Sequence, residues 1–207
     1  MPSADSIRAV FFDLGNVLMY FDWNIALERL RAAGTVDPKA VRAEIIQNEI
    51  YHQYECGRLS TAEFMRVLLD RSRFSGTLDE LESIWNEIFT PMDTNLDLLA
   101  RLKTRYITAI LSNTNAAHIA YLQKHFDLSA RVHHPLYSYE LGLRKPGADF
   151  FQAALNRTAL QPSQCVFIDD LLENVHGARA VGLHTVHYQT GETDLERELA
   201  RLGVGVD

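Results

Sequence analysis

The chain of 207 residues has few cysteines, no excess of positive charge and no long apolar run. Cys56 and Cys165 lie far apart without metal-type spacing, so we interpret them as reduced packing residues. The formal net charge of -7 argues against a nucleic-acid or anionic-membrane surface, because either favours a basic patch. Residues 1–9 lack the layout of a signal peptide, and no apolar stretch approaches the length of a membrane span. We therefore expect a cytoplasmic globular protein that binds neither nucleic acid nor membrane.

Apolar residues make up 47% of the chain, which is ample for a sizeable core. Three near-continuous apolar runs are predicted strands, and a fourth alternates less regularly: Ala9–Phe12, Ile107–Leu111, Cys165–Ile168 and Leu183–Tyr188. Helical stretches separate these runs, and this alternation is typical of a parallel sheet covered on both faces. The predicted fold class is therefore α/β, with a Rossmann-like parallel sheet.

Polar residues follow directly after the first three predicted strands: Asp13, then Ser112 and Asn113, then Asp169 and Asp170. In an open parallel sheet, ligands bind beyond the carboxyl ends of the strands. We therefore expect these polar residues to meet in one crevice.

The pattern between Asp22 and Phe89 is helical. Ser60–Glu63 and Thr77–Glu80 match capping boxes that precede amphipathic runs, and Asp37-Pro38 reads as a further helix start. We predict four helices and no strand in this block, with hinges near 19–22 and 89–93. Residues 1–19 and 91–207 are thus expected to form the core, and residues 20–90 an inserted helical cap.

Asp13 is the leading candidate for chemistry. A carboxylate at a strand end can be a nucleophile, a metal ligand or a cap for the following turn. Gly15, two residues later, also suits tight-turn geometry. The convergence of Asp13 with the other polar clusters favours a functional role.

Ser112 and Asn113 precede a predicted helix over 116–125. Ser112 could cap that helix, and the same geometry also suits a phosphate, because helix N-terminal amides bind anions. Lys145 lies in a loop before Pro146, which biases Lys145 to an extended backbone. A fixed ammonium beside the crevice suits a phosphoryl group or paired carboxylates, whereas we interpret Arg144 as a surface residue.

The adjacent Asp169 and Asp170 repel one another unless a cation intervenes. Oxygen ligands of this kind suit Mg²⁺, and Asn174 is placed to support the loop by hydrogen bonding. His133 and His134 lack acidic companions and are interpreted as loop residues. In the predicted cap, His52 near Glu55 is a further candidate to face the crevice.

Taken together, four segments resemble the motifs of the haloacid dehalogenase superfamily of aspartate-nucleophile hydrolases, in order and spacing. They are Phe11–Leu18, Ile110–Asn113, Gly142–Pro146 and Phe167–Asp170 with Asn174-Val175. The Asp-Leu-Gly-Asn-Val form of the first motif, with Tyr54–Ser60, resembles a bacterial group related to an α-glucose-1-phosphate phosphatase. The resemblance implies a Rossmann-like core, a helical cap and Mg²⁺-dependent phosphoryl transfer through a phosphoaspartate.

The resemblance also implies roles for single residues. Asp13 would attack phosphorus and bind Mg²⁺, Ser112 and Asn113 would hold phosphoryl oxygens, and Lys145 would neutralise charge. Asp170 would be the main metal ligand of the fourth motif, with Asp169 bound directly or through water. The backbone carbonyl of Gly15 would be a further ligand.

Gly15 stands where the family ordinarily has a second aspartate, the general acid and base. Such catalysis typically contributes about 10²- to 10⁴-fold. The first expectation is a Mg²⁺-dependent phosphatase of small phosphorylated metabolites, with sugar phosphates as candidates. The alternatives are a weakly active or non-catalytic phosphate-binding protein and a 2-haloacid dehalogenase, which the pair Asp169 and Asp170 disfavours. The expected partner is a small phosphate ester, and the expected state a monomer or homodimer.

Overall fold

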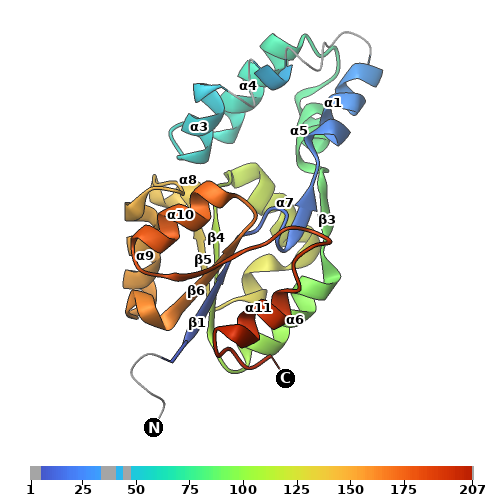
Figure 1. Cartoon of the computed structure of the whole chain (residues 1–207). Helices are drawn as coiled ribbons and strands as arrows, with labels where there is room; N and C mark the ends of the chain where they lie inside the picture. The colour runs from blue at the N-terminus through green and yellow to red at the C-terminus, as the bar shows by residue number, and fades with distance from the viewer. Residues whose placement is uncertain (1–5, 34–40, 44–47, 207) are drawn as a thin grey trace.

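The computed structural model describes residues 6–33, 41–43 and 48–206. Among these, five parallel strands form one sheet in the order β5-β4-β1-β6-β7 (Figure 1). Their bounds are Ala9–Phe12 (β1), Ile107–Ser112 (β4), His134–Tyr137 (β5), Cys165–Asp169 (β6) and His184–His187 (β7). The central strand β1 lies between β4 and β6, with Phe12 in register with Ile110 and Ile168. The predicted α/β class with a parallel sheet is confirmed.

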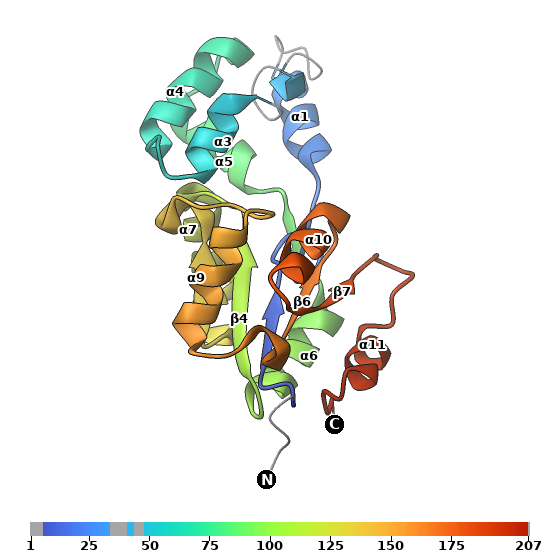
Figure 2. The ribbon, with the colours of Figure 1, turned by 60° about the vertical axis from the view of Figure 1, so that its left-hand side comes forward.

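Helices cover both faces of the sheet (Figures 1 and 2). On one face pack α6 (Asp93–Lys103), α7 (Ala116–Phe126) and α11 (Leu195–Arg201), and on the other α9 (Ala148–Thr158) and α10 (Leu172–Ala180). Val10 and Phe12 of β1 face the first group, and Ala9 and Phe11 face the second. Because both faces of β1 are buried, its sequence is continuously apolar rather than alternating. Short helical segments complete the core: η2 (Leu128–Arg131), α8 (Ser138–Leu141) and η3 (Pro162–Gln164).

The edge strand β5 was not expected from the sequence, where His134 was interpreted as a loop residue. Its sequence, His-Pro-Leu-Tyr, has no continuous apolar run, and Pro135 lacks the N–H that a strand with two neighbours needs. An edge strand tolerates a proline, and β5 pairs only with β4 among the described residues. The loop interpretation is therefore wrong for His134.

A helical insert, defined here as α1 (Trp23–Ala32), α3 (Glu49–Glu55), α4 (Thr61–Ser72) and α5 (Leu78–Asn86), lies above the carboxyl ends of the strands (Figure 1). Both predicted capping boxes are present, at the starts of α4 and α5. The expected helix start at Asp37-Pro38 lies outside the described residues. The division into a core and a cap at residues 20 and 90 stays a prediction.

The two predicted hinges contain short strands. β2 (Met19–Phe21) and β3 (Phe89–Pro91) pair antiparallel, with Phe21 opposite Phe89. Each is only three residues long, so neither produces a recognisable pattern in the sequence. This ribbon is the covalent connection between the sheet and the helical insert.

Apolar and aromatic packing holds the helical insert together and against α7. Trp85 is 2% exposed, and its ring centroid lies 4.6 Å from that of Trp23 and 4.9 Å from that of Phe64. The ring of His118 in α7 stacks on Trp85 at 5.6 Å. None of the described helices is long and apolar enough to cross a membrane.

Candidate active site

The carboxyl ends of three neighbouring strands bring the predicted polar residues together. Asp13 follows β1, Ser112 ends β4 and Asp169 ends β6. These strands are adjacent in the sheet and in register, so their ends lie at the same edge. A crevice of about 340 Å³ opens there, lined by Asp13, Gly15, Ser112, Asn113, Lys145 and Asp170 among others. The expected convergence is therefore observed.

Three carboxylates gather at this edge of the sheet, two of them, Asp13 and Asp170, in the lining of the crevice and the third, Asp169, buried beside them. Asp13, Asp169 and Asp170 each offer an oxygen, and these oxygens lie within 4.8 Å of one another. Asp169 is fully buried, and the amide of Asn174 donates to its two oxygens at 3.0 and 3.1 Å. The amide of Asn16 donates to Asp170 at 3.0 Å. The supporting hydrogen bond expected of Asn174 is present.

Lys145 provides the positive charge of the cluster. Its buried ammonium lies 2.8 Å from Oδ1 of Asp13 and 2.6 Å from Oδ2 of Asp169. Burial opposes this charge, but the two carboxylates outweigh burial and raise the pKa of Lys145 above its ordinary value. The lysine is therefore a fixed cation.

The side chain of Asn113 positions Lys145. Its amide nitrogen donates to the Lys145 carbonyl at 2.9 Å, and its oxygen accepts from the Lys145 N–H at 2.8 Å. These two bonds fix the Asn113 side chain against the Lys145 backbone, which leaves the Asn113 backbone N–H and the second amide hydrogen as donors. Sequence reasoning did not anticipate this positioning role.

The electrostatics of the cluster favour a cation. Burial raises the pKa of Asp13 to about 8, Lys145 opposes that shift, and the nearby Asp169 and Asp170 add to it. One lysine does not balance three carboxylates, so bringing them together costs free energy that a divalent ion would recover. An all-oxygen set of this kind is typical of Mg²⁺ or Ca²⁺, and Mg²⁺ commonly takes a few carboxylates and keeps several waters. The residues present therefore fit a magnesium site.

Ser112 does not cap helix α7, contrary to one expectation. The N-cap is Asn115, whose side-chain oxygen accepts from the His118 N–H at 3.0 Å. Ser112 ends β4 three residues earlier and is 3% exposed, with its hydroxyl 3.5 Å from the Asn113 carbonyl. Asn115 caps α7, and Ser112 instead lines the crevice.

The ring of Phe21 occupies the space beside Gly15. A Cβ atom at position 15 would lie 2.7 Å from Cε1 and 3.0 Å from Cδ1 of Phe21, closer than side chains pack. The position where the family ordinarily has a general acid is thus closed by an aromatic ring from β2. The sequence showed that the carboxylate is missing but not that its space is filled.

The helical insert contributes to the same crevice. His52 and Glu55 of α3 line it, as does Arg144 from the core. Arg144 forms an ion pair with Glu55 at 2.6 Å, and its side chain is only 28% exposed, so it is a partly buried residue of the crevice rather than the surface residue that was predicted. The partner lies some ninety residues away in the sequence and in a different part of the fold, so no local pattern could reveal the pair.

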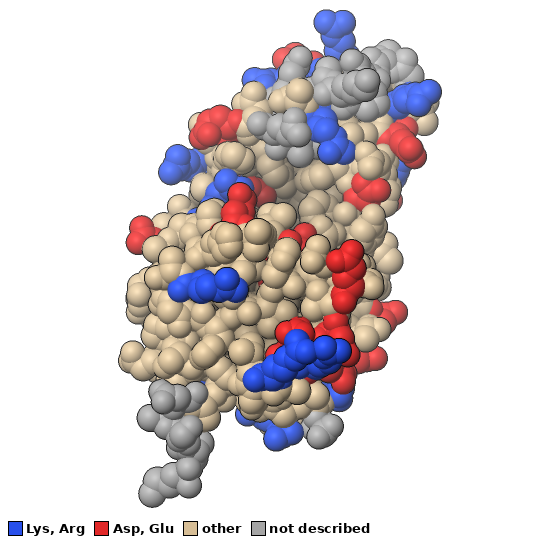
Figure 3. All heavy atoms as spheres, in the orientation of Figure 1, with Lys and Arg blue, Asp and Glu red and all other residues tan. Residues whose placement is uncertain are grey.

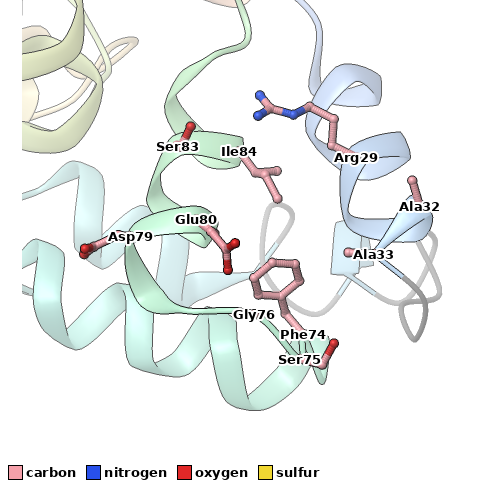
Figure 4. Close-up of a pocket in the computed structure, with 10 residues that line it drawn as sticks. All are labelled: Arg29, Ala32, Ala33, Phe74, Ser75, Gly76, Asp79, Glu80, Ser83 and Ile84. Atoms are coloured by element: carbon pink, nitrogen blue, oxygen red, sulfur yellow. The ribbon is translucent and has the colours of Figure 1, made fainter.

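Another cavity, of about 660 Å³, lies between α1 and the segment from Phe74 to Ile84 (Figure 4). None of the predicted site residues lines it. The charged side chains on the face shown in Figure 3 are scattered, and the positive ones do not merge into one basic surface there.

Comparison with known proteins gives a consistent result. The sequence model of a family described as haloacid dehalogenase-like hydrolase matches residues 7–182. A D-ribitol-5-phosphate phosphatase of Bacteroides thetaiotaomicron is 28% identical over 200 residues, which are 93% of this chain and 97% of the relative.

Solved structures agree. A haloacid dehalogenase family enzyme of Bacteroides thetaiotaomicron, in complex with magnesium and inorganic phosphate, matches with a TM-score of 0.82 at 26% identity. The match covers 91% of this chain and 98% of that one. An L-2-haloacid dehalogenase of Xanthobacter autotrophicus, with chloropropionic acid covalently bound, matches with a TM-score of 0.64 at 20% identity. That match covers 96% of this chain and 84% of the dehalogenase, and it shows a shared fold alone.

Proposed function

Since the chain belongs to the haloacid dehalogenase-like hydrolase family, we propose that it is a Mg²⁺-dependent phosphatase of small sugar or sugar-alcohol phosphates. The observation that carries this proposal is the cluster of Asp13, Asp169 and Asp170 around the ammonium of Lys145. The magnesium and phosphate bound by a structural relative support it. The relative named for D-ribitol 5-phosphate favours a sugar-alcohol phosphate, whereas the first motif resembles a glucose-1-phosphate group.

Asp13 is the proposed nucleophile. Its Oδ1 accepts from the Leu14 N–H at 2.7 Å and from Lys145 at 2.8 Å, so we assign the attack on phosphorus to Oδ2. As the bond from Oδ2 to phosphorus forms, the bond from phosphorus to the leaving oxygen breaks, and the leaving alkoxide takes its proton from water. A second water then attacks the phosphorus of the phosphoaspartate and gives up its proton to solvent, which releases inorganic phosphate and restores the carboxylate.

The other residues provide charge and orientation. Lys145 balances the negative charge of Asp13 and of the transferred group, and Ser112 with the Asn113 N–H would hold phosphoryl oxygens. Asp13, Asp170, Asp169 and the Gly15 carbonyl are the proposed ligands of Mg²⁺. When bound, the ion would neutralise phosphoryl charge in the transition state.

The test is the release of inorganic phosphate from a panel of esters, with Mg²⁺ and with EDTA. The panel contains ribitol 5-phosphate, glucose 1-phosphate, glucose 6-phosphate and p-nitrophenyl phosphate, and 2-chloropropionate serves as a halide-release control. We expect EDTA to lower phosphate release about 10³-fold, because a Lewis acid contributes several kcal/mol. Halide release without phosphate release would establish the dehalogenase alternative, and tight phosphate binding without turnover would establish the binding-protein alternative.

A further inference from the structure

The ion pair between Arg144 and Glu55 lies in the lining of the crevice. Glu55 is the last residue of α3 and is only 5% exposed, and Arg144 directly precedes Lys145. A cation of the core is thus held by an anion of the helical insert.

The backbone near this pair is closely packed, so the pair has a fixed place. Gly57 follows Glu55 by two residues and has a φ of +67°. A Cβ atom there would lie 2.1 Å from the Tyr139 carbonyl oxygen of α8. Only glycine allows the turn after α3 to approach the core this closely. The geometry therefore holds Glu55 beside Arg144.

The described residues that line the crevice include two lysine or arginine side chains, and both are already paired. Lys145 contacts Asp13 and Asp169, and Arg144 contacts Glu55. His52 also lines the crevice, and its imidazole lies 3.8 Å from the carboxylate of Glu49, a residue outside the lining. Lys145 and the proposed metal would offset the three carboxylates, and a second anionic group of the substrate would meet no unpaired lysine or arginine among these lining residues.

A smaller chamber of about 130 Å³ adjoins the crevice beside Glu55. The two spaces share Gly15, Phe21, Glu55, Ser112 and Asn113. The chamber is lined by aromatic side chains and a few polar groups, including Phe21, Trp23, Tyr51, Phe89 and Thr114. Aromatic faces suit the C–H groups of a sugar or polyol, and a carboxylate accepts hydrogen bonds from its hydroxyls.

We propose that Glu55, by holding Arg144, is a specificity-determining residue that selects neutral, hydroxyl-bearing leaving groups. A leaving group with a carboxylate or a second phosphate would lie next to the Glu55 carboxylate and find Arg144 occupied. Juxtaposed like charges at a binding site weaken binding. This inference rests on the proposed phosphatase function and names the class of its substrate.

The experiment compares kcat/KM for ribitol 5-phosphate, a neutral polyol ester, with that for phosphoglycolate, which carries a carboxylate. The wild-type protein is expected to prefer ribitol 5-phosphate. Glu55→Gln keeps the shape of the side chain and leaves Arg144 unpaired, so the preference should shift toward phosphoglycolate by about tenfold or more. Arg144→Gln leaves Glu55 as an unpaired anion and should shift the preference the opposite way.

Glu28→Gln is the matched control, because Glu28 is an exposed residue of α1 that lines neither space. It should leave the ratio unchanged. The inference would be overturned if the wild-type protein had the same kcat/KM for both esters. It would also be overturned if neither Glu55→Gln nor Arg144→Gln changed the ratio of the two kcat/KM values. Both results would leave the proposed phosphatase function intact. A wild-type protein that releases phosphate from no ester of the panel would overturn the proposed function and the inference with it. The wild-type comparison and the Arg144→Gln arm remain decisive if Glu55→Gln does not fold.

Discussion

The carboxylate cluster and the helical insert are stabilised by opposite kinds of interaction. Around Asp13, a buried lysine and three carboxylates are fixed by hydrogen bonds to strand ends and loops. In the helical insert, Trp23, Tyr51 and Trp85 pack ring against ring. The charged cluster costs stability and supplies chemistry, whereas the aromatic cluster supplies stability and shapes the space beside the chemistry. Substitutions in the carboxylate cluster should therefore lower activity, whereas substitutions in the aromatic cluster should lower the free energy of unfolding.

The largest effect is expected from Asp13→Asn, which should lower kcat by roughly 10⁴-fold or more while the protein stays folded. The amide has nearly the same shape as the carboxylate but is a poor nucleophile. The measurement is phosphate release by the purified variant, with its thermal unfolding recorded alongside. Substantial turnover by a variant of verified mass would contradict the covalent mechanism, and loss of the fold would contradict the contrast between the two regions.

Trp85→Ala is expected to lower the stability of the protein and to preserve its activity. Removing this buried ring from its contacts with Trp23, Phe64 and His118 should lower the free energy of unfolding by about 3–5 kcal/mol. The carboxylate cluster is untouched, so the folded fraction should keep measurable phosphatase activity. Urea unfolding gives the free energy, and Tyr20→Ala, a change at a half-exposed ring, should cost far less. A Trp85→Ala protein as stable as its parent would show that the rings do not hold the insert.

A smaller effect concerns the pH dependence of stability. Burial lowers the pKa of His118 to about 3, from 6.5 for an ordinary histidine. The unfolded chain therefore binds a proton that folded His118 does not, so the contribution of His118 is full above pH 6.5 and is lost as the pH falls toward 3. From this group alone, the free energy of unfolding should be about 2 kcal/mol lower at pH 5 than at pH 8. His118→Phe keeps a ring in place and should show a shallower slope, and equal slopes for the two proteins would refute the assignment.

The smallest effect is expected where the two regions meet, at Gly15 and Phe21. Without a general acid at position 15, esters with good leaving groups should react faster, so glucose 1-phosphate should outpace glucose 6-phosphate. Gly15→Asp alone must displace the Phe21 ring and should not restore an acid. Gly15→Asp with Phe21→Ala opens the space and should raise kcat/KM for the 6-phosphate about tenfold relative to the 1-phosphate. Phe21→Ala alone is the control, and the same ratio in the control and the double variant would disprove the leaving-group argument.

Local patterns in the sequence predicted four of the five sheet strands and the starts of two helices of the insert. Apolar strands that end in Asp13, Ser112 and Asp169 are local patterns, and the rule for parallel sheets turns them into one crevice. The family expected from four motifs is confirmed, and so is the α/β class. The strands β2, β3 and β5 were missed, because they are short or contain proline.

Three features of the site depend on tertiary contacts, which no local pattern encodes. Asn113 holds Lys145, Phe21 fills the space at Gly15, and Glu55 pairs with Arg144. Each arises only when the insert and the loops are packed against the sheet. The candidate residues were therefore readable from the sequence, whereas the proposed selectivity rests on contacts that only the structure shows.

The phosphoaspartate is the central claim, and trapping it is the most direct test. Wild-type protein mixed with excess ester in the presence of Mg²⁺ and quenched in acid within the first turnovers should carry one phosphoryl group. Mass spectrometry should place that group on the peptide containing Asp13, and Asp13→Asn should carry none. Steady turnover by the wild-type protein with no phosphoryl group on that peptide, or with the group on another residue, would contradict the account.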